Sequence, residues 1–274
     1  MRGAAGASTL IALPPYLMVL ASIIAANLAG GLLSVLAAAL IAFAVLERWV
    51  PRLVSFAVGA LLGVALLKLL PEAIASQAGA QAVFATLLVG LLVFFLLEKL
   101  ALWRHSHGAG DHAHGHHGHA PTGPASPVGA LIVLGDSLHN FVDGLLIAAA
   151  FLTDPALGWT TAVAVIAHEV PQEVGDFMIL LDAGYTRRRA LMLNALSSLA
   201  SVAGGVLGYF ALRAAQHALP YILALAAAGF IYIAVADLIP NLHRRFAVKD
   251  ALSQVALIGL GVAVVVIAGQ GHGH

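Results

Sequence analysis

The sequence predicts an all-α integral membrane protein whose eight transmembrane helices form a bundle. Of its 274 residues, 61% are hydrophobic and only 9% are charged, whereas a soluble domain carries about 25% charged residues. The mean hydropathy is +0.97. The apolar residues form stretches of the length that a helix needs to cross a hydrocarbon core of about 30 Å. Long helices of this kind satisfy every backbone polar group internally, as such a core requires.

The eight candidate spans follow one another along the whole chain. Their expected boundaries are 17–46, 53–75, 80–102, 128–152, 158–182, 187–212, 218–243 and 251–270. The first stretch is longer than a bilayer requires, so it is expected to tilt or to extend beyond the membrane. Residues 1–274 are therefore expected to form a single transmembrane domain.

Basic residues are concentrated in the loops that follow spans one, three, five and seven. These residues are Arg48, Arg52, Lys99, Arg104, Arg187, Arg188, Arg189, Arg244, Arg245 and Lys249. On the other side stand only Arg2 and Arg213, and Lys68 lies within the second span. Because basic loops stay in the cytoplasm, we expect a multi-pass protein of the plasma or inner membrane with both termini outside.

Polar residues interrupt the fourth and fifth spans, in "HNFVDGLLIAAAFL" (139–152) and "HEVPQEVGDFMILL" (168–181). Residues four apart share one face of a helix, which places His139 with Asp143 and His168 with Gln172. Asn140 and Glu169 flank the same stripes. If the two helices face each other, these groups converge. The candidate metal ligands are His139, Asn140, Asp143, His168, Glu169 and Gln172.

Imidazole and carboxylate together suit Zn²⁺, Fe²⁺, Mn²⁺ and similar first-row ions. The chain contains no cysteine, so thiolate ligands are excluded. Each ionisable residue at membrane depth costs a few kcal/mol, so these groups should face one another, water or a cation. Pro171 removes one helical hydrogen bond, and the freed carbonyl near His168 would be a further oxygen ligand. The plain alternative is a buried polar network that only joins helices.

The two motifs together resemble the paired signature of the ZIP (Zrt-, Irt-like) family of divalent-metal transporters. The similarity is closest to the branch whose fifth span reads His-Glu-x-Pro-His/Gln-Glu-x-Gly-Asp. Residues 56–73 and 227–242 resemble the second and seventh spans of that family. The resemblance implies a ZIP-type bundle that moves a divalent cation into the cytoplasm, with zinc as the first candidate and iron or manganese as further ones. The ion is then the substrate, and neither enzymatic activity nor an organic cofactor is expected.

The resemblance also implies a binuclear metal site midway through the membrane. By motif position, one ion is held by His139, Asp143, His168, Glu169 and Gln172. The other ion is held by Asn140, Asp143, Glu169 and Gln172, with bridging carboxylates. Some members add a carboxylate on span six, where this chain has Ser201, so the second site is expected to be weaker or absent.

Further polar residues are candidates for an ion pathway or for outer partners of the ligands, with simple packing as the alternative. They are Lys68, Asp136, Glu173, Asp176, Ser201, Asp237 and His243. Lys68 stands where the family often has histidine, so it either reaches toward the outer surface or acts as a gate on the entry path. Glu173 and Asp176 either relay the ion inward or pair with Asn194 and Ser198.

A histidine-rich loop separates spans three and four. Residues 105–127 are too polar and glycine-rich to pack, so we expect a disordered cytoplasmic loop that binds metal loosely. The alternative is a flexible linker. The candidate ligands in this loop are His105, His107, His112, His114, His116, His117 and His119.

Two functions of other classes remain as alternatives. An intramembrane zinc metalloprotease places His-Glu-x-x-His on a span, but position 172 is glutamine. A metal sensor that does not transport is the third interpretation. The formal net charge of zero argues against nucleic acid as a partner. The expected partners are metal ions and the lipid bilayer, and a homodimer is left open.

Overall fold

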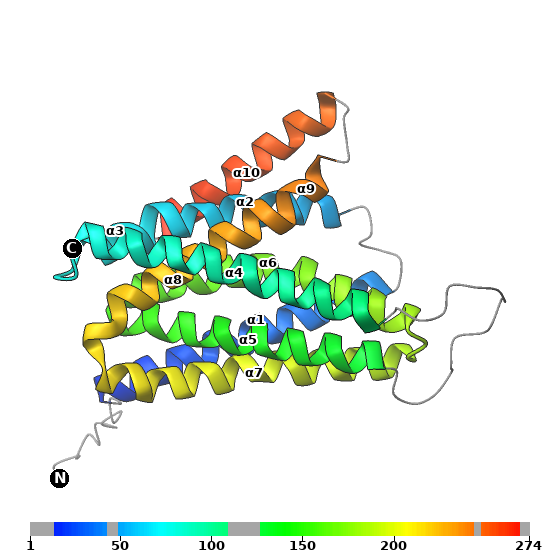
Figure 1. Ribbon diagram of the computed structural model, residues 1–274, viewed down its shortest axis with the longest axis horizontal. Helices are drawn as coiled ribbons and strands as arrows, with labels where there is room; N and C mark the ends of the chain where they lie inside the picture. The colour runs from blue at the N-terminus through cyan, green and yellow to red at the C-terminus, as the bar shows by residue number, and fades with distance from the viewer. Residues whose placement is uncertain (1–13, 43–48, 109–126, 244–247, 269–274) are drawn as a thin grey trace, which may run out of the picture.

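The computed structural model describes residues 14–42, 49–108, 127–243 and 248–268, and every regular element in these ranges is a helix (Figure 1). In chain order these elements are α1 (Pro15–Ala42), α2 (Val50–Val64), η1 (Ala65–Leu69), α3 (Leu70–Ala75), α4 (Ala80–Gly108), α5 (Pro127–Thr153), α6 (Pro155–Asp182), α7 (Arg187–Ala214), η2 (Gln216–Ala218), α8 (Leu219–Tyr232), η3 (Ile233–Leu238), α9 (Ile239–Leu242) and α10 (Val248–Ala268).

Seven helical segments in the described ranges are long and apolar enough to cross a membrane. Each falls on one of the predicted spans. The predicted fifth span, α6, is not among the seven. It has 28 residues, but Glu169, Glu173 and Asp176 lie in its second half. The same acidic residues that mark the candidate site therefore lower the hydropathy of this helix.

The predicted second and seventh spans are each interrupted by a π-helical segment. In the second span η1 is followed by Leu70-Pro71, and in the seventh η3 is followed by Ile239-Pro240. A proline cannot donate to the carbonyl four residues earlier, and its ring collides with that carbonyl. One wider turn before each proline relieves the collision, which accounts for the interruptions.

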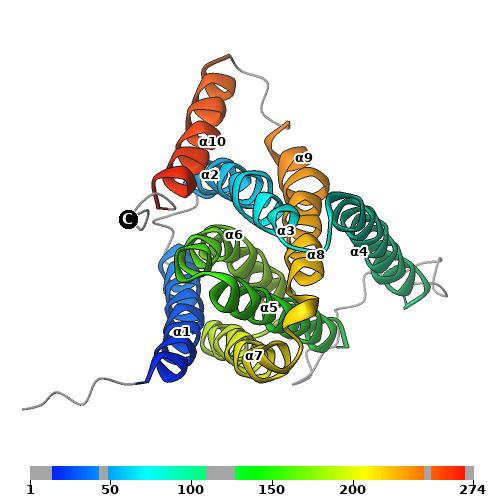
Figure 2. The same ribbon diagram turned by 90° about the vertical axis from the view of Figure 1, so that its left-hand side faces the viewer.

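The helices run back and forth along the long axis of the molecule and pack in two groups (Figures 1 and 2). In the first group α1, α5, α6 and α7 contact one another, with the most extensive packing between α5 and α7. In the second group α2 packs against α10, and α4 against α8. The contact between α2 and α6 joins the groups, so α6 lies where both meet.

Glycines allow α5 and α7 to touch through their backbones. A methyl group added at Gly144 would strike the carbonyl of Ser201, and one added at Gly204 would strike the carbonyl of Phe141. Small residues at such crossings let membrane helices approach closely. This contact fixes α5 along α7 and thereby sets the position along the helix axis of His139, Asn140 and Asp143, which flank Phe141.

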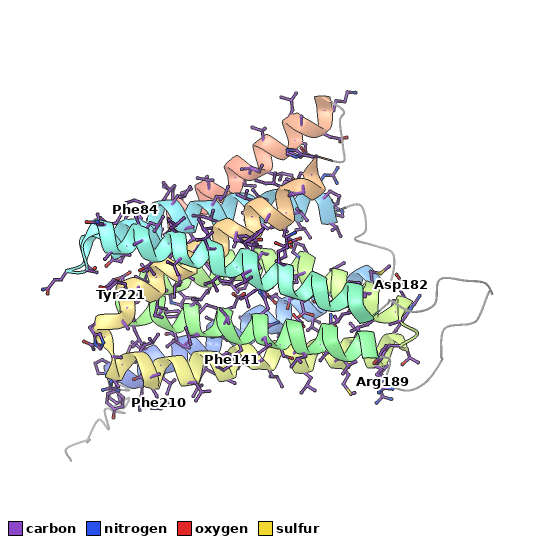
Figure 3. All side chains as sticks on the ribbon, in the orientation of Figure 1. Phe84, Phe141, Asp182, Arg189, Phe210 and Tyr221 are labelled. Carbon is purple, nitrogen blue, oxygen red and sulfur yellow. The ribbon has the colours of Figure 1, made fainter. Side chains whose placement is uncertain are left out.

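Large apolar side chains cover much of the outer surface, as Figure 3 shows. Leu88 and Leu92 of α4 are each 59% exposed, and Leu252 of α10 is 68% exposed. Such a surface suits contact with lipid. The end of the bundle that carries Arg52, Arg189 and Lys249 is called the basic end below.

Most of the predicted histidine-rich loop lies outside the described residues. α4 continues to Gly108 and α5 begins at Pro127, so only the first and last residues of the range 105–127 fall in helices. The side chains of the seven loop histidines are not among those described. Disorder and metal binding in this loop stay predictions.

Candidate metal centre

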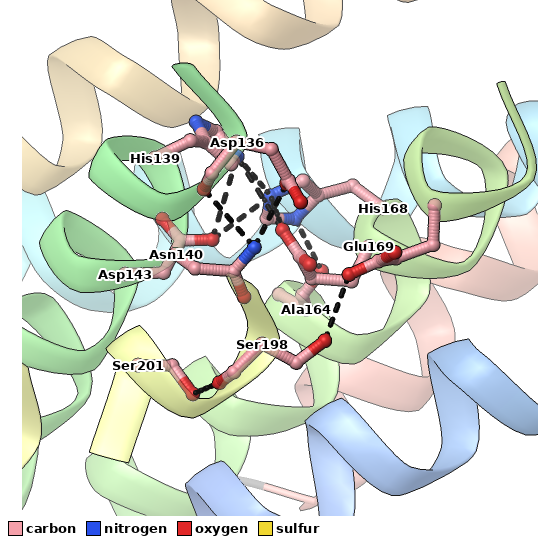
Figure 4. Close-up of polar contacts among 10 residues, drawn as sticks. Asp136, His139, Asn140, Asp143, Ala164, His168, Glu169, Ser198 and Ser201 are labelled. Atoms are coloured by element: carbon pink, nitrogen blue, oxygen red, sulfur yellow. Dashed lines mark hydrogen bonds and ion pairs between the residues drawn. The ribbon is translucent and has the colours of Figure 1, made fainter. Parts of the chain in front are cut away.

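Four side chains from two neighbouring helices meet in the interior. α5 supplies His139 and Asp143, and α6 supplies His168 and Glu169 (Figure 4). One ligand atom of each residue lies within 4.8 Å of the others. The predicted convergence of the two helices is therefore confirmed for these four residues.

The spacing of these atoms matches a single coordination sphere. The Nε2 atom of His168 lies 3.1 Å from Oδ2 of Asp143 and 3.7 Å from Oε1 of Glu169. The Nε2 atom of His139 lies 3.6 Å and 3.4 Å from the same two oxygens. Ligands about 2.0–2.1 Å from a tetrahedral zinc ion are about 3.3–3.4 Å apart. The cluster is thus already close to the size that zinc requires.

A backbone contact orients the imidazole of His168. Its Nδ1 atom lies 3.2 Å from the carbonyl oxygen of Ala164, one helical turn earlier. A carbonyl can only accept, so Nδ1 carries the hydrogen and Nε2 presents its lone pair to the cluster. Metal-binding histidines are commonly held in this way. Ala164 was not among the predicted site residues, although it precedes His168 by four residues on the same helix.

Several oxygens in the cluster are buried without a hydrogen-bond partner. Among the described residues these are Oδ2 of Asp143 and both carboxylate oxygens of Glu169. Asp143 is 2% exposed, Glu169 3% and His168 1%. Burying two carboxylates is costly, and the imidazoles of His139 and His168 at 3.1–3.7 Å offset only part of that cost. A divalent cation between the carboxylates would offset more of it.

The other two predicted ligands take different positions. The amide nitrogen of Asn140 donates to Oδ1 of Asp136 at 2.9 Å, so this end of the side chain is engaged by a residue outside the four-residue cluster. Gln172 is half-buried and lines a cavity together with His168. Asn140 is therefore tied to Asp136, while Gln172 borders the cluster from the cavity side.

A cavity of about 630 Å³ leads from His168 toward the basic end. Its wall includes Pro171 and Gln172 of α6, Asp237 of η3 and, at the far end, Leu242 of α9. Pro171, which lies inside the continuous helix α6, and the π-helical segment η3 both border this space. Pro171 and η3, which are far apart in the sequence, thus border the same cavity.

Polar contacts continue from the cluster into α7. Ser198 donates to Oε1 of Glu173 at 2.8 Å, and the amide of Asn194 donates to the carbonyl of Glu173 at 2.8 Å. The predicted pairing of Glu173 with Asn194 and Ser198 is confirmed. Ser201 donates to the carbonyl of Ser198 at 2.8 Å, so its hydroxyl group is engaged within its own helix. Asp176 is half-buried.

Lys68 and His243 are not part of the cluster. Lys68 is half-buried on η1 and borders a separate cavity of about 360 Å³, together with Glu72 and Asp154, at the end opposite the basic end. His243 is exposed just after α9 at the basic end. The structure thus places these two residues at opposite ends of the molecule.

Comparison with known proteins identifies the family of this chain. Residues 104–269 match the family model described as "ZIP Zinc transporter". Zinc transporter ZIP13 of Pongo abelii is 32% identical over 234 residues, which cover 79% of this chain and 66% of the relative. ZIP13 of Gallus gallus is 30% identical over 271 residues, covering 81% of this chain and 74% of the relative.

Other relatives are much longer than the part that they share with this chain. Zinc transporter foi of Drosophila melanogaster is 38% identical over 160 residues, which cover 56% of this chain but only 22% of foi. The chain thus spans less than two thirds of the length of several curated relatives that it matches. The predicted resemblance is confirmed, because the matching region includes both histidine motifs together with α7 to α10: the chain belongs to the ZIP zinc transporter family.

Proposed function

We propose that this protein carries a divalent first-row cation, zinc before iron or manganese, across a membrane. His139, Asp143, His168 and Glu169 would bind the ion. The observation that carries the proposal is the buried cluster itself, whose ligand atoms lie within 4.8 Å of one another and whose carboxylates have orphan oxygens. Membership of a family of zinc transporters supports the same conclusion, and it favours transport over enzymatic activity.

Asn140 and Gln172 are assigned to a weaker second position. Gln172 borders the cluster from the cavity, and rotation of the Asn140 amide away from Asp136 would bring its oxygen toward Asp143. Ser201, which would have to replace the carboxylate of some relatives, is hydrogen-bonded to its own helix. We therefore propose one strong site, with a second ion held only loosely between the bridging carboxylates.

We propose further that α6 is the eighth span. At about 1.5 Å per residue, its 28 residues extend about 42 Å, which exceeds the hydrocarbon core. Its acidic residues do not need to face lipid, because Glu169 and Glu173 are 3% and 0% exposed. α1, α2, α5 and α7 all contact α6, and Ser198 of α7 donates to Glu173.

The direction of transport is proposed to be toward the basic end. Basic loops stay in the cytoplasm, and the 630 Å³ cavity extends from His168 toward that end. Asp237 borders this cavity and would give a departing ion a further oxygen ligand. Asp136, Glu173 and Asp176 are assigned to the inner surroundings of the site, and His243 and the loop histidines to later contacts. Both termini would then lie outside.

Two variants test this function. The chain is reconstituted in liposomes, and uptake of Zn²⁺, Fe²⁺, Mn²⁺ and Cd²⁺ is followed with a trapped dye or a radiotracer. We expect zinc flux in the wild type, loss of flux in His168→Ala, and unchanged flux in His217→Ala, since His217 is exposed on η2. Equal flux in the wild type and in His168→Ala would reject the proposed site. Absence of flux for every ion in the wild type would reject transport.

A zinc protease is not supported. The position that would supply its second histidine is occupied by Gln172, which borders the cavity, and the family to which the chain belongs is one of transporters. A sensor that does not transport is separated from a carrier by the same liposome experiment.

A further inference from the structure

A polar cleft opens between α2 and α10 at the basic end. The two helices cross closely at Gly59 and Gly261, where an added methyl group would strike the carbonyl of Ile258 or of Phe56. From this crossing toward the basic end the helices separate, as both ribbon views show (Figures 1 and 2). The tight crossing therefore leaves a wedge-shaped space between the first turns of the two helices.

The wedge is lined mainly by polar side chains. Its volume is about 250 Å³, and its wall includes Arg52 and Ser55 of α2 and Lys249, Asp250, Ser253 and Gln254 of α10. Within the described ranges no ion pair is recorded for either cation. Two positive groups and one negative group leave a net positive charge. Arginine, lysine and hydroxyl groups together form a common setting for a phosphate group.

The wedge lies at the level where a membrane surface is expected. It is built from the first turns of two candidate spans, Val50–Ala75 and Lys249–Ala268. Trp49 precedes α2, is 47% exposed, and lies under the guanidinium group of Arg52 at 4.8 Å. Tryptophan is enriched at the boundary between lipid and water. Leu252 and Val255, on the face of α10 that is turned away from the wedge, are 68% and 69% exposed and would contact acyl chains at the same level.

We propose that this wedge binds the phosphate group of an anionic phospholipid. Basic pockets between membrane helices on the cytoplasmic side hold anionic head groups. A free phosphate ion would use only the polar wall, whereas a lipid would also contact Leu257, the apolar side chain that lines the wedge nearer the crossing. This apolar part of the wall thus favours the lipid.

The wedge also shares structural elements with the inner cavity. Pro51 lines both spaces, and the amide of Gln254 donates to the carbonyl of Leu242 at 3.1 Å, while Leu242 lines the inner cavity. A bound lipid would therefore brace the mouth of that cavity. This consequence rests on the proposed transport function, but lipid binding itself does not.

Native mass spectrometry of the purified full chain tests the binding. Phosphatidylglycerol is titrated against phosphatidylcholine, and retained lipid is counted for each. Each cation near a membrane surface contributes about 1 kcal/mol to binding of anionic lipid, or about fivefold in affinity. We expect Arg52→Gln/Lys249→Gln to bind phosphatidylglycerol at least about tenfold more weakly than the wild type, and Arg188→Gln, at the same end but outside the wedge, to bind it normally. An unchanged affinity of the double variant would overturn the proposal.

A third variant tests whether misfolding could explain weaker lipid binding by the double variant. Asp250→Asn removes the one acidic group of the wedge, so it should bind phosphatidylglycerol about fivefold more tightly. A damaged fold would not produce such a gain. Unchanged or weaker binding by this variant would contradict the proposal. Displacement of phosphatidylglycerol by inorganic phosphate at equal concentration would show that the wedge recognises a free anion and would overturn the assignment to lipid.

Discussion

The Nε2 atoms of His139 and His168 lie 3.3 Å apart, although one side chain belongs to α5 and the other to α6. The rings meet edge to face at 87°. Carboxylate oxygens of Asp143 and Glu169 lie 3.1–3.7 Å from these nitrogens. Two nitrogens and two carboxylates at such spacing could hold one cation, as proposed above.

Asp143→Asn should weaken zinc binding. The substitution keeps the size of the side chain but removes a negative charge whose Oδ2 atom lies 3.1 Å from Nε2 of His168 and 3.6 Å from Nε2 of His139. Loss of an outer partner of a metal ligand already costs about 10–100-fold in affinity, so loss of this charge should cost at least about 100-fold. Isothermal titration calorimetry measures the affinity, and thermal unfolding in detergent measures stability.

Asp182→Asn is the matched control for this experiment, because Asp182 is exposed at the end of the same helix as His168. It should leave the zinc affinity and the melting temperature unchanged. If Asp143→Asn bound zinc as tightly as the wild type, Asp143 would not be a ligand.

Gly204→Ala should destabilise the fold. Its new methyl group would meet the carbonyl of Phe141 and push α7 away from α5, and overpacking of this kind costs about 1–3 kcal/mol. Gly135→Ala is the control, because nothing lies within 4 Å of a methyl group at that position. Alanine is better than glycine inside a helix by about 1 kcal/mol, so this control should be at least as stable as the wild type. Equal melting temperatures for both variants would mean that α5 and α7 can accommodate the added methyl group without a loss of stability.

Ser201→Glu should strengthen a second metal position. The residue is 6% exposed, and a carboxylate placed there would be buried and costly without a cation. We therefore expect this variant to melt at a lower temperature than the wild type without zinc and to gain more from added zinc. Ser201→Gln, which has the same size without the charge, should gain no more than the wild type. A similar zinc effect in both variants would exclude a second ion near α7.

Lys68→Gln should speed zinc uptake at low zinc concentration. Lys68 borders the 360 Å³ cavity that also includes Glu72 and Asp154, and it repels an approaching cation. Removing one such charge is worth about 1 kcal/mol, or about fivefold in rate. Because salt screens exposed charges, the difference between variant and wild type should shrink as ionic strength rises. If the variant and the wild type took up zinc at the same rate at both low and high salt, Lys68 would not lie on the entry path.

The sequence alone was sufficient to predict the helical fold class and the pairs of polar residues that share one face of a helix. Apolar stretches of span length and a spacing of four residues are local properties, so His139 with Asp143 could be assigned to one helix face without a structure. The count of spans was harder, because Glu169, Glu173 and Asp176 make α6 polar. Only seven of the eight expected helices are apolar enough to be identified as spans.

The tertiary structure decided which of these groups meet. The distance from His139 to His168 depends on how α5 lies against α6. α5 is in turn held along α7 by backbone contacts such as Gly204 with Phe141, which no spacing within one helix determines. The tertiary packing also places Lys68 in a cavity apart from the cluster. Helical periodicity acts over one turn, whereas the site exists only where two helices are held side by side.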